Sequence, residues 1–367
     1  MTQSQKDEID FTALPKIELH AHLSGSISRQ CLHEIWLKKK AEGKTDLEDP
    51  LVVMPEGKHD YDLKTFFPLF STYTYRLIDD AWSLRYSTLS VLRDFAADGV
   101  VYLELRTTPR EMPAAGLDKE DYVRLVLDTI SQYEAAEPPA SGPGMMHTRL
   151  ILSVDRRNTL PEAQHVLSLA EKFHSPDDRN VNVVALDLCG DPSAPDIYKF
   201  APVLDSRAPR RRLIPTLKTT LHFAEAECSS SDAELSTLLS WQPDRIGHVI
   251  HISQTIREAI VARGGGTDEK RPYGLELCLS CNVHAGMISG GFEEHHFGEW
   301  WQEKDCVVVI CTDDVGVFGS KLSNEYALVA HHFGLGRAEI CALARRGIDV
   351  IFAGEDEKAR LREIMWT

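Results

Sequence analysis

Short apolar runs recur along the whole chain and predict buried strands. Each run holds six or seven residues and is rich in aliphatic or β-branched side chains. Such runs are typical of strands that are covered on both faces, as in a parallel sheet. The eight runs are Ile17–Leu23, Val100–Arg106, Arg149–Val154, Val183–Leu188, Thr219–Glu225, Arg245–Ile250, Leu275–Ser280 and Val307–Asp313.

Longer segments with apolar residues at helical spacing separate these runs. Ala81–Ala97 and Leu160–Phe173 are two that predict amphipathic helices. Alternation of strand and helix indicates a parallel sheet with crossover helices. Eight such units within 367 residues fit one (β/α)8 TIM barrel. We therefore expect an α/β fold and a single domain over residues 1–367, although the length alone also allows two domains.

The interval 24–90 is longer than one crossover helix requires. It contains the charged stretch Lys38–Lys64, which leads into a cluster of aromatic side chains. The cluster consists of Phe66, Phe67, Phe70, Tyr73 and Tyr75. Long insertions at the mouth of a barrel often act as lids. We expect residues 24–90 to form a helical, lid-bearing insertion after the first strand. The aromatic spacing favours core packing, with a cover over a substrate as the alternative.

The charge of the chain limits its partners. The formal net charge is −16, which argues against binding to a nucleic acid polymer or to an anionic membrane. No apolar run is long enough to cross a bilayer. The polar segment Met1–Asp10 resembles neither a signal peptide nor a transit peptide. We expect a cytoplasmic protein that acts as a monomer.

The eight cysteines favour the same compartment. Cys278 and Cys281 form a C-x-x-C pair, but Cys306 and Cys311 have the wrong spacing to complete a zinc ribbon. Cys278 and Cys311 lie inside apolar runs, where a thiol behaves as a small hydrophobic group. We expect reduced, structural cysteines.

Metal-binding and titratable residues gather at the ends of the predicted strands. Catalytic groups of a TIM barrel come from these carboxyl ends. The residues are His20 and His22 on the first strand, His222 and Glu225 on the fifth, His248 on the sixth, and Asp313 and Asp314 on the eighth. A lone histidine near a core is usually just hydrogen-bonded there, but a set of this size at one end of a barrel indicates chemistry.

Three histidines with one carboxylate suit Zn²⁺ with one position left for water. Zinc lowers the pKa of bound water to about 7 and so supplies hydroxide at neutral pH. His248 is suited to deprotonate and orient that water, and Glu225 to donate a proton to a ring nitrogen. The residue types predict a mononuclear metal-dependent hydrolase and leave the substrate open.

Five motifs run along the chain from the first predicted strand to the eighth. They are LPKIELHAHLSGS at Leu14, GDP at Gly190, HFAE at His222, RIGH at Arg245 and TDD at Thr312. With these motifs in this order, the chain resembles the adenosine deaminase family of the amidohydrolase superfamily. The resemblance implies one Zn²⁺ per chain, held by His20, His22, His222 and Asp313. It also implies Glu225 as the proton donor to purine N1 and His248 as the water-orienting base. Asp314 would bind purine N7, and the Gly190 N–H would contact the purine.

Further segments resemble the adenosine deaminase-like branch, which deaminates N6-methyl-AMP and related N6-substituted purine nucleotides. They include LELRTTPR at Leu103, SVDRRN at Ser153 and LELCLSCNV at Leu275. The resemblance implies further substrate contacts by His22, Ser24, Thr74, Thr107, Thr108, Pro109, Arg110 and Asp155.

Two of these positions depart from the patterns of the family. Ser24 stands where adenosine deaminases have Asp, adenine deaminases Glu and the branch Asn, and Thr74 stands where the branch has His. Ser24 shares with Asn the lack of a charge that would repel a phosphate. We expect Arg110 to give the phosphate cradle its only positive charge. The predicted reaction is hydrolysis of N6-methyl-AMP to IMP and methylamine.

Other functions stay open at this stage. An adenosine or adenine deaminase is the first alternative, and a catalytically inactive barrel used as a binding scaffold is the second. A two-metal amidohydrolase usually has a carboxylated lysine on the fourth strand, which VVALDL does not offer.

Overall fold

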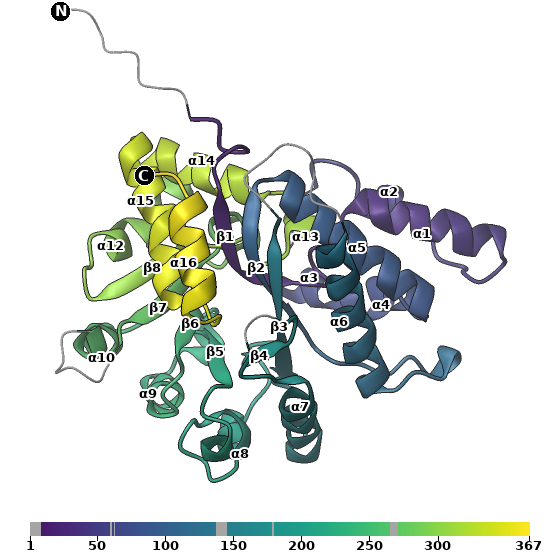
Figure 1. The fold of residues 1–367 in the computed structure, drawn as a ribbon, viewed down its shortest axis with the longest axis horizontal. Helices are drawn as coiled ribbons and strands as arrows, with labels where there is room; N and C mark the ends of the chain where they lie inside the picture. Colours follow the sequence, from purple (N-terminus) through teal and green to yellow (C-terminus); the bar gives the residue numbers. More distant parts are fainter. Residues whose placement is uncertain (1–8, 59–60, 62, 137–144, 178–179, 265–270) are drawn as a thin grey trace, which may run out of the picture.

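The chain folds into a parallel barrel. The computed structural model describes residues 9–58, 61, 63–136, 145–177, 180–264 and 271–367. Eight strands pair in the order β1 to β8, each parallel to the next. The strands are β1 (Lys16–His22), β2 (Val100–Thr107), β3 (His147–Asp155), β4 (Val183–Cys189), β5 (Lys218–Phe223), β6 (Arg245–His248), β7 (Tyr273–Leu277) and β8 (Cys306–Ile310). A parallel bridge between Ala21 and Asp313 brings the last strand back to the first. The predicted (β/α)8 barrel is confirmed (Figure 1).

Each of the eight apolar runs forms a strand, but β5, β6, β7 and β8 end two or three residues earlier than predicted. β5 stops at Phe223 and β8 stops at Ile310, so that Glu225 and Asp313 lie just beyond the strands. The backbone turns into the left-handed region at Ala224, with φ of 53°, and at Asp313, with φ of 62°. This conformation departs from the extended backbone of a regular strand.

The two segments predicted as helices are confirmed at both ends. α5 (Ala81–Ala97) begins after Asp80, which accepts a hydrogen bond from the Ser83 N–H. α7 (Leu160–Phe173) begins after Thr159, which forms a reciprocal capping box with Glu162. The remaining helices after α5 are α6 (Lys119–Ala135), α8 (Ala201–Leu204), α9 (Asp232–Ser240), α10 (Gln254–Gly264), α11 (Leu279–His284), α12 (Phe297–Trp301), α13 (Val315–Phe318), α14 (Leu322–Phe333), α15 (Arg337–Arg346) and α16 (Glu355–Ile364).

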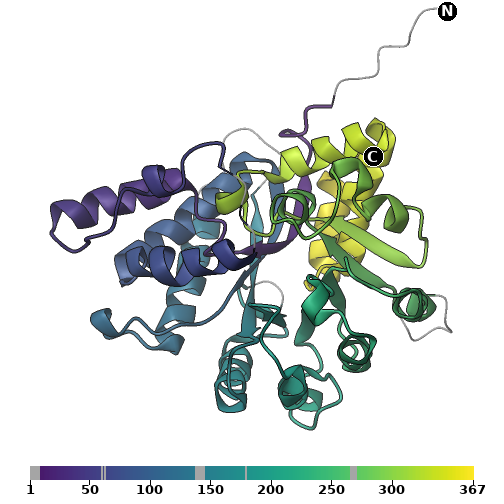
Figure 2. The same cartoon turned by 180° about the vertical axis from the view of Figure 1, so that it is seen from behind.

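The described part of the predicted insertion is helical. It contains α1 (Arg29–Ala41), α2 (Pro50–Val53), α3 (Leu63–Leu69), a π-helical turn at Phe70–Thr74 and α4 (Tyr75–Leu77), and it runs on into α5. Figures 1 and 2 place these helices together on one side of the barrel, away from α9 and α10. Residues 59–60 and 62 of the insertion, and residues 1–8 of the polar N-terminal segment, lie outside the described residues.

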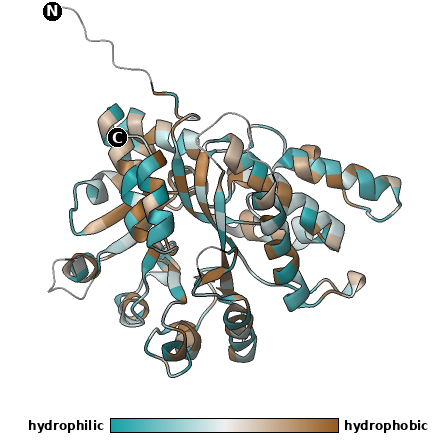
Figure 3. Ribbon diagram, in the orientation of Figure 1, coloured by the Kyte–Doolittle hydropathy of each residue, from teal (hydrophilic) through white to brown (hydrophobic). Residues whose placement is uncertain are grey.

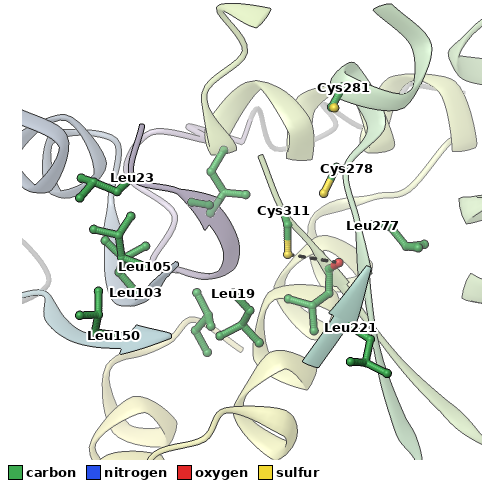
Figure 4. Close-up of a cluster of buried hydrophobic side chains, with 14 of the residues drawn as sticks. Leu19, Leu23, Leu103, Leu105, Leu150, Leu221, Leu277, Cys278, Cys281 and Cys311 are labelled. Carbon is green, nitrogen blue, oxygen red and sulfur yellow. Dashed lines mark hydrogen bonds between the residues drawn. The ribbon is translucent and has the colours of Figure 1, made fainter. Parts of the chain in front are cut away.

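Apolar side chains fill the space between the strands and the surrounding helices. Figure 3 shows hydrophobic stretches along the strands and hydrophilic ones on the outer turns of helices such as α1 and α16. Leu19, Leu103 and Leu277 are fully buried and come from β1, β2 and β7 (Figure 4). Cys278 and Cys311 are buried in the same cluster. All eight cysteines, each within the described residues, are unpaired.

None of the helices in the described segments combines the length and the apolar character that a bilayer crossing requires.

Buried charges cross the interior of the barrel. Arg245 on β6 donates from Nε to Glu276 Oε1 at 2.6 Å and from Nη2 to Glu104. Arg106 on β2 donates from Nη2 to Glu276 Oε2 at 2.7 Å and lies 3.3 Å from Asp187. All five side chains have no exposed surface. Charges without water need such partners, so these ion pairs tie β2, β4, β6 and β7 together.

Replacing Arg245 is expected to destabilise the barrel. Arg245→Met leaves Glu104 and Glu276 buried with less compensation, which should lower the free energy of unfolding by about 3 to 5 kcal/mol. Urea unfolding followed by circular dichroism measures the change. Arg362→Met is the control, because Arg362 pairs with Asp349 and Glu355 at the exposed surface, and its loss should cost about 1 kcal/mol or less. Equal losses in the two variants would contradict this assignment.

Candidate active site

Four predicted metal ligands converge at the carboxyl end of the barrel. One ligand atom from each of His20, His22, His222 and Asp313 lies within 4.8 Å of the others. The Nε2 atoms of His22 and His222 are 3.1 Å apart. Asp313 Oδ1 lies 3.4 Å from His20 Nε2 and 3.3 Å from His22 Nε2. The alternation of side chains along β1 explains why His20 and His22 point to the same centre.

Two carboxylates that the sequence reasoning missed hold the histidine rings. Glu276 on β7 lies 2.7 Å from His20 Nδ1, and Asp187 on β4 lies 3.1 Å from His222 Nδ1. Each carboxylate accepts the Nδ1–H and leaves Nε2 free to face the centre, an arrangement common around metal-binding histidines. Both belong to apolar strand runs, and an acidic residue inside such a run is the signal that could have identified them.

The donor set fits a divalent metal. His20 Nε2 is buried and has no hydrogen-bond partner among the described residues. Burial opposes a charge on His20, yet Asp313 and Glu276 raise its pKa to about 9. Burial, in contrast, holds the pKa of His22 well below its usual value. The carboxylates therefore attract positive charge to a centre surrounded by imidazole nitrogens, which suits a cation bound by nitrogen and oxygen ligands.

The backbone around this centre is strained. Ala224, His248, Val249 and Asp313 have φ between 53° and 67°, and they make up four of the six described non-glycine residues in the left-handed region. Such strain costs free energy and gathers at functional sites. The left-handed residues stand at or just beyond the ends of β5, β6 and β8, next to or at Glu225, His248 and Asp313.

Two more carboxyl groups lie beside the cluster in environments that favour protonation. Burial raises the pKa of Glu225 to about 7. Burial, followed by the charge of Asp313, raises the pKa of Asp314 well above its usual range. Gly25 permits the position of Asp314, because a Cβ at residue 25 would lie 1.4 Å from Asp314 Oδ1. A carboxyl group with a pKa near 7 can donate a proton at neutral pH.

A cavity adjoins the cluster, and most of the predicted residues line it. They are His22, Ser24, Thr107, Thr108, Asp155, Gly190, His222, Glu225, Asp313 and Asp314. His20 and His248 are fully buried beneath them. Thr74 and Pro109 are not among the lining residues; Thr74 is 5% exposed and packs within the π-helical turn.

The positively charged side chain on the cavity wall is not the one that the sequence suggested. Arg157 lines the cavity, whereas Arg110 does not. The Arg110 guanidinium donates to the Ile78 carbonyl and lies 4.7 Å from the ring centroid of Tyr75. Arg157 forms a two-pronged pair with Asp155, from Nε to Oδ1 at 2.8 Å and from Nη2 to Oδ2 at 2.6 Å. Arg110 follows β2 and Arg157 follows β3. The contacts of Arg110 with the insertion hold its guanidinium away from the cavity.

The aromatic side chains of the insertion pack against one another and also line the cavity. Phe66 packs against Phe67 and Phe70 with ring centroids 5.2 and 5.1 Å apart. The same three rings and Tyr75 also line the cavity, together with Ser71. The insertion therefore provides one apolar wall beside the polar residues from the strand ends.

A parallel (β/α)8 barrel with three histidines and an aspartate at the carboxyl end has the architecture of the amidohydrolase superfamily. The sequence model of adenosine deaminase matches residues 15–366. The chain therefore belongs to the adenosine deaminase family.

Several relatives within the family cover nearly the whole chain. The N6-methyl-AMP deaminase of Homo sapiens is 34% identical and covers 98% of this chain and 95% of its own length. A Xenopus laevis protein of the same description is 35% identical over 96% of this chain and 93% of its own. The crystal structure of an Arabidopsis N6-mAMP deaminase superposes with a TM-score of 0.83 at 33% identity, over 96% of this chain and 98% of that one. Another structure of an Arabidopsis relative contains IMP, with a TM-score of 0.82 at 32% identity over 96% of each chain.

Removal of a ligand should empty the metal site. We expect His22→Ala and Asp313→Ala to lose bound metal, because each removes a donor atom from the centre. Metal analysis of the purified proteins measures this, with His165→Ala, a change on α7 outside the site, as the control that keeps its metal. Full metal occupancy in both ligand variants would show that these residues do not form the site.

Proposed function

We propose that this protein is a zinc-dependent deaminase of purine nucleotides that hydrolyses N6-methyl-AMP to IMP and methylamine. The observation that carries the proposal is the cavity in which Glu225 and Asp314, two carboxyl groups with raised pKa values, lie beside the histidine and aspartate cluster. The similarity to N6-methyl-AMP deaminases over nearly the full chain supports the substrate.

The proposed metal ligands are His20, His22, His222 and Asp313, and the proposed ion is one Zn²⁺ per chain. When bound, zinc would polarise the attacking water at neutral pH. Glu276 and Asp187 occupy the Nδ1 atoms of His20 and His222, so the Nε2 atoms of both rings would be available to hold the ion. His248 Nε2 lies 3.9 Å from Asp313 Oδ2, and in this proposal it would contact the attacking water.

The purine end of the substrate is held by polar groups in this proposal. Glu225 donates its proton to N1 as water adds to C6, which leaves the ring with a neutral N1–H and Glu225 as a carboxylate. Asp314 keeps its own proton, because its pKa is raised well above the usual range, and donates a hydrogen bond to N7. The Gly190 N–H contacts the same ring. The Asp313 carboxylate, on the same cavity wall, accepts one proton of the attacking water and passes it to the departing N6 nitrogen. Collapse of the tetrahedral carbon at C6 then forms the C6=O bond, releases methylamine and returns the second water proton to Glu225.

The net charge of −16 repels a phosphate at long range. The phosphate of the substrate must therefore be bound by a cradle of polar and positively charged groups close to it. Ser24, Thr107 and Thr108 supply hydroxyl groups on the cavity wall. Arg157 supplies positive charge, although Asp155 neutralises it until a phosphate arrives. Ser24 lacks the carboxylate that would repel a phosphate by about 4 kcal/mol at 4 Å and intermediate dielectric. These features favour a nucleotide over adenosine or adenine.

We also propose one catalytic domain over residues 1–367, with the 24–90 insertion moving as a lid over the cavity. The aromatic wall of the insertion supports this role. A monomer in the reducing cytoplasm agrees with the unpaired cysteines.

Glu225→Gln should abolish most turnover without emptying the metal site. The amide cannot donate the N1 proton, so kcat should fall by roughly 10²- to 10⁴-fold. Steady-state kinetics with zinc-loaded protein measures the loss. Glu227→Gln, an exposed change two residues further on, is the matched control and should retain wild-type kcat. A loss smaller than about tenfold at Glu225 would be incompatible with its role as the acid.

A spectrophotometric substrate panel tests the proposed function. Zinc-loaded protein should turn over N6-methyl-AMP with a far higher kcat/KM than AMP, adenosine, N6-methyladenosine or adenine. Arg157→Gln should raise KM for the monophosphate by about tenfold or more, because a charge-assisted hydrogen bond is worth roughly 1.5 to 3 kcal/mol.

The panel contains its own controls. Arg157→Gln should leave KM for any nucleoside unchanged, and Arg110→Gln should affect KM for the monophosphate less than Arg157→Gln does. A preference of the wild type for adenosine or adenine would refute the nucleotide assignment. An equal rise of KM for the monophosphate in Arg157→Gln and Arg110→Gln would refute the assignment of Arg157 to phosphate binding.

A further inference from the structure

A buried chain of hydrogen bonds ends on the side of His248 that faces away from the metal cluster. The Phe297 backbone N–H donates to His295 Nδ1 at 3.0 Å. His295 Nε2 lies 3.2 Å from Asn282 Oδ1, and Asn282 Nδ2 lies 3.1 Å from His248 Nδ1. This series of hydrogen bonds connects the first turn of α12 to α11 and then to the end of β6.

The direction of every hydrogen bond in this chain follows from its first member. A backbone N–H can only donate, so His295 Nδ1 must accept and the neutral ring carries its proton on Nε2. Burial lowers the pKa of His295 well below its usual value and so favours that neutral ring. His295 Nε2–H then donates to Asn282 Oδ1. This fixes the orientation of the amide, and Asn282 Nδ2–H donates to His248 Nδ1.

Water does not compete with these contacts. Asn282 and His248 are fully buried and His295 is 2% exposed. The neighbouring His296 also holds His248, because His296 Nε2–H donates a hydrogen bond to the His248 backbone carbonyl at 2.6 Å. His248 is thus held by both its ring and its backbone, in a left-handed conformation with φ of 67°.

The opposite ring nitrogen of His248 faces the site. His248 Nε2 is buried, has no hydrogen-bond partner among the described residues and lies 3.9 Å from Asp313 Oδ2. Because Nδ1 accepts from Asn282, a neutral His248 ring carries its proton on Nε2. The Nε2–H group of His248 therefore points into the space beside Asp313.

We propose that Asn282 and His295 are positioning residues that fix His248 as the Nε2–H tautomer. The inference rests on the proposed function for the identity of the reaction. His248 then donates a hydrogen bond to the oxygen of the attacking water and keeps this bond as the tetrahedral intermediate forms. No proton leaves His248 and none is accepted at Nε2. This role differs from that of a base, which the resemblance to the family implied.

The ring protonation can be measured directly on zinc-loaded protein without substrate. In protein labelled with ¹⁵N-histidine, long-range ¹H–¹⁵N correlation spectra distinguish protonated from unprotonated ring nitrogens, and comparison with His248→Ala assigns the signals. We expect wild-type His248 to be protonated on Nε2 and unprotonated on Nδ1. An Nδ1 that carries the proton in the wild type would overturn the proposal.

Asn282→Asp tests the chain with an almost isosteric change. A carboxylate can only accept, so it should draw a proton onto His248 Nδ1 while the metal content stays at the wild-type level. We expect kcat to fall by at least about tenfold, with KM changed less than threefold, because the neutral Nε2–H donor acts on the transition state rather than on substrate binding. Unchanged Nδ1 protonation, or a loss confined to KM, would contradict the proposal.

Two further variants separate this effect from loss of packing. His295→Gln retains an amide donor toward Asn282 and should preserve the Nε2–H form. Asn182→Asp is the matched control, since Asn182 is also buried but donates to the Asn180 carbonyl at the start of β4, outside the site. It should leave the His248 signals and kcat as in the wild type. A shift of the His248 signals in Asn182→Asp would indicate a general packing effect and refute the specific role of Asn282.

The proposed function and this inference can fail separately. An Nε2–H tautomer in a protein that does not deaminate the nucleotide would refute the substrate and leave the positioning chain intact. Efficient deamination with His248 protonated on Nδ1 would refute the positioning chain alone.

Discussion

A single buried carboxylate connects most of the barrel interior. Glu276 on β7 accepts hydrogen bonds from Arg106 on β2, Thr220 on β5 and Arg245 on β6, and it also holds His20 on β1. The two arginines outweigh the effect of burial and keep its pKa well below the usual range. An ionised group without water is tolerated only when every partner is in place. The position of the His20 ring therefore depends on the correct pairing of strands around the barrel.

The sequence was sufficient for the architecture and for the central cluster. Strand positions followed from apolar runs, and the convergence of His20, His22, His222 and Asp313 followed from their places at the strand ends. Glu276 and Asp187 were missed for a physical reason. Their contacts join strands that are distant in sequence, such as the 256 positions between His20 and Glu276, and no periodicity within one strand reveals a partner on another. Their acidic side chains in apolar runs were visible, but their partners were not.

The nucleotide end was harder to predict, because loops and an insertion build it. Arg110 and Arg157 belong to similar loops after β2 and β3, and the sequence offered no basis for ranking their directions. The difference arises from Tyr75 and Ile78 in the insertion, which hold the Arg110 guanidinium away from the cavity. Asn282 and His295 were equally hidden, since their relation to His248 depends on how α11 and α12 pack beside β6.

The left-handed residues at the mouth of the barrel have a consequence for engineering. Glycine adopts this conformation without steric cost, so Val249→Gly would relieve strain at a residue that is otherwise 1% exposed core. The same change would loosen the backbone next to His248. Val249→Gly would also remove a buried side chain and give the unfolded chain more freedom, and these losses outweigh the relieved strain. The change would therefore lower both the thermal stability and the precision of the active-site backbone. Attempts to make the enzyme more heat-resistant would do better to begin on the outer helices, where a substitution does not alter the turns that carry the chemistry.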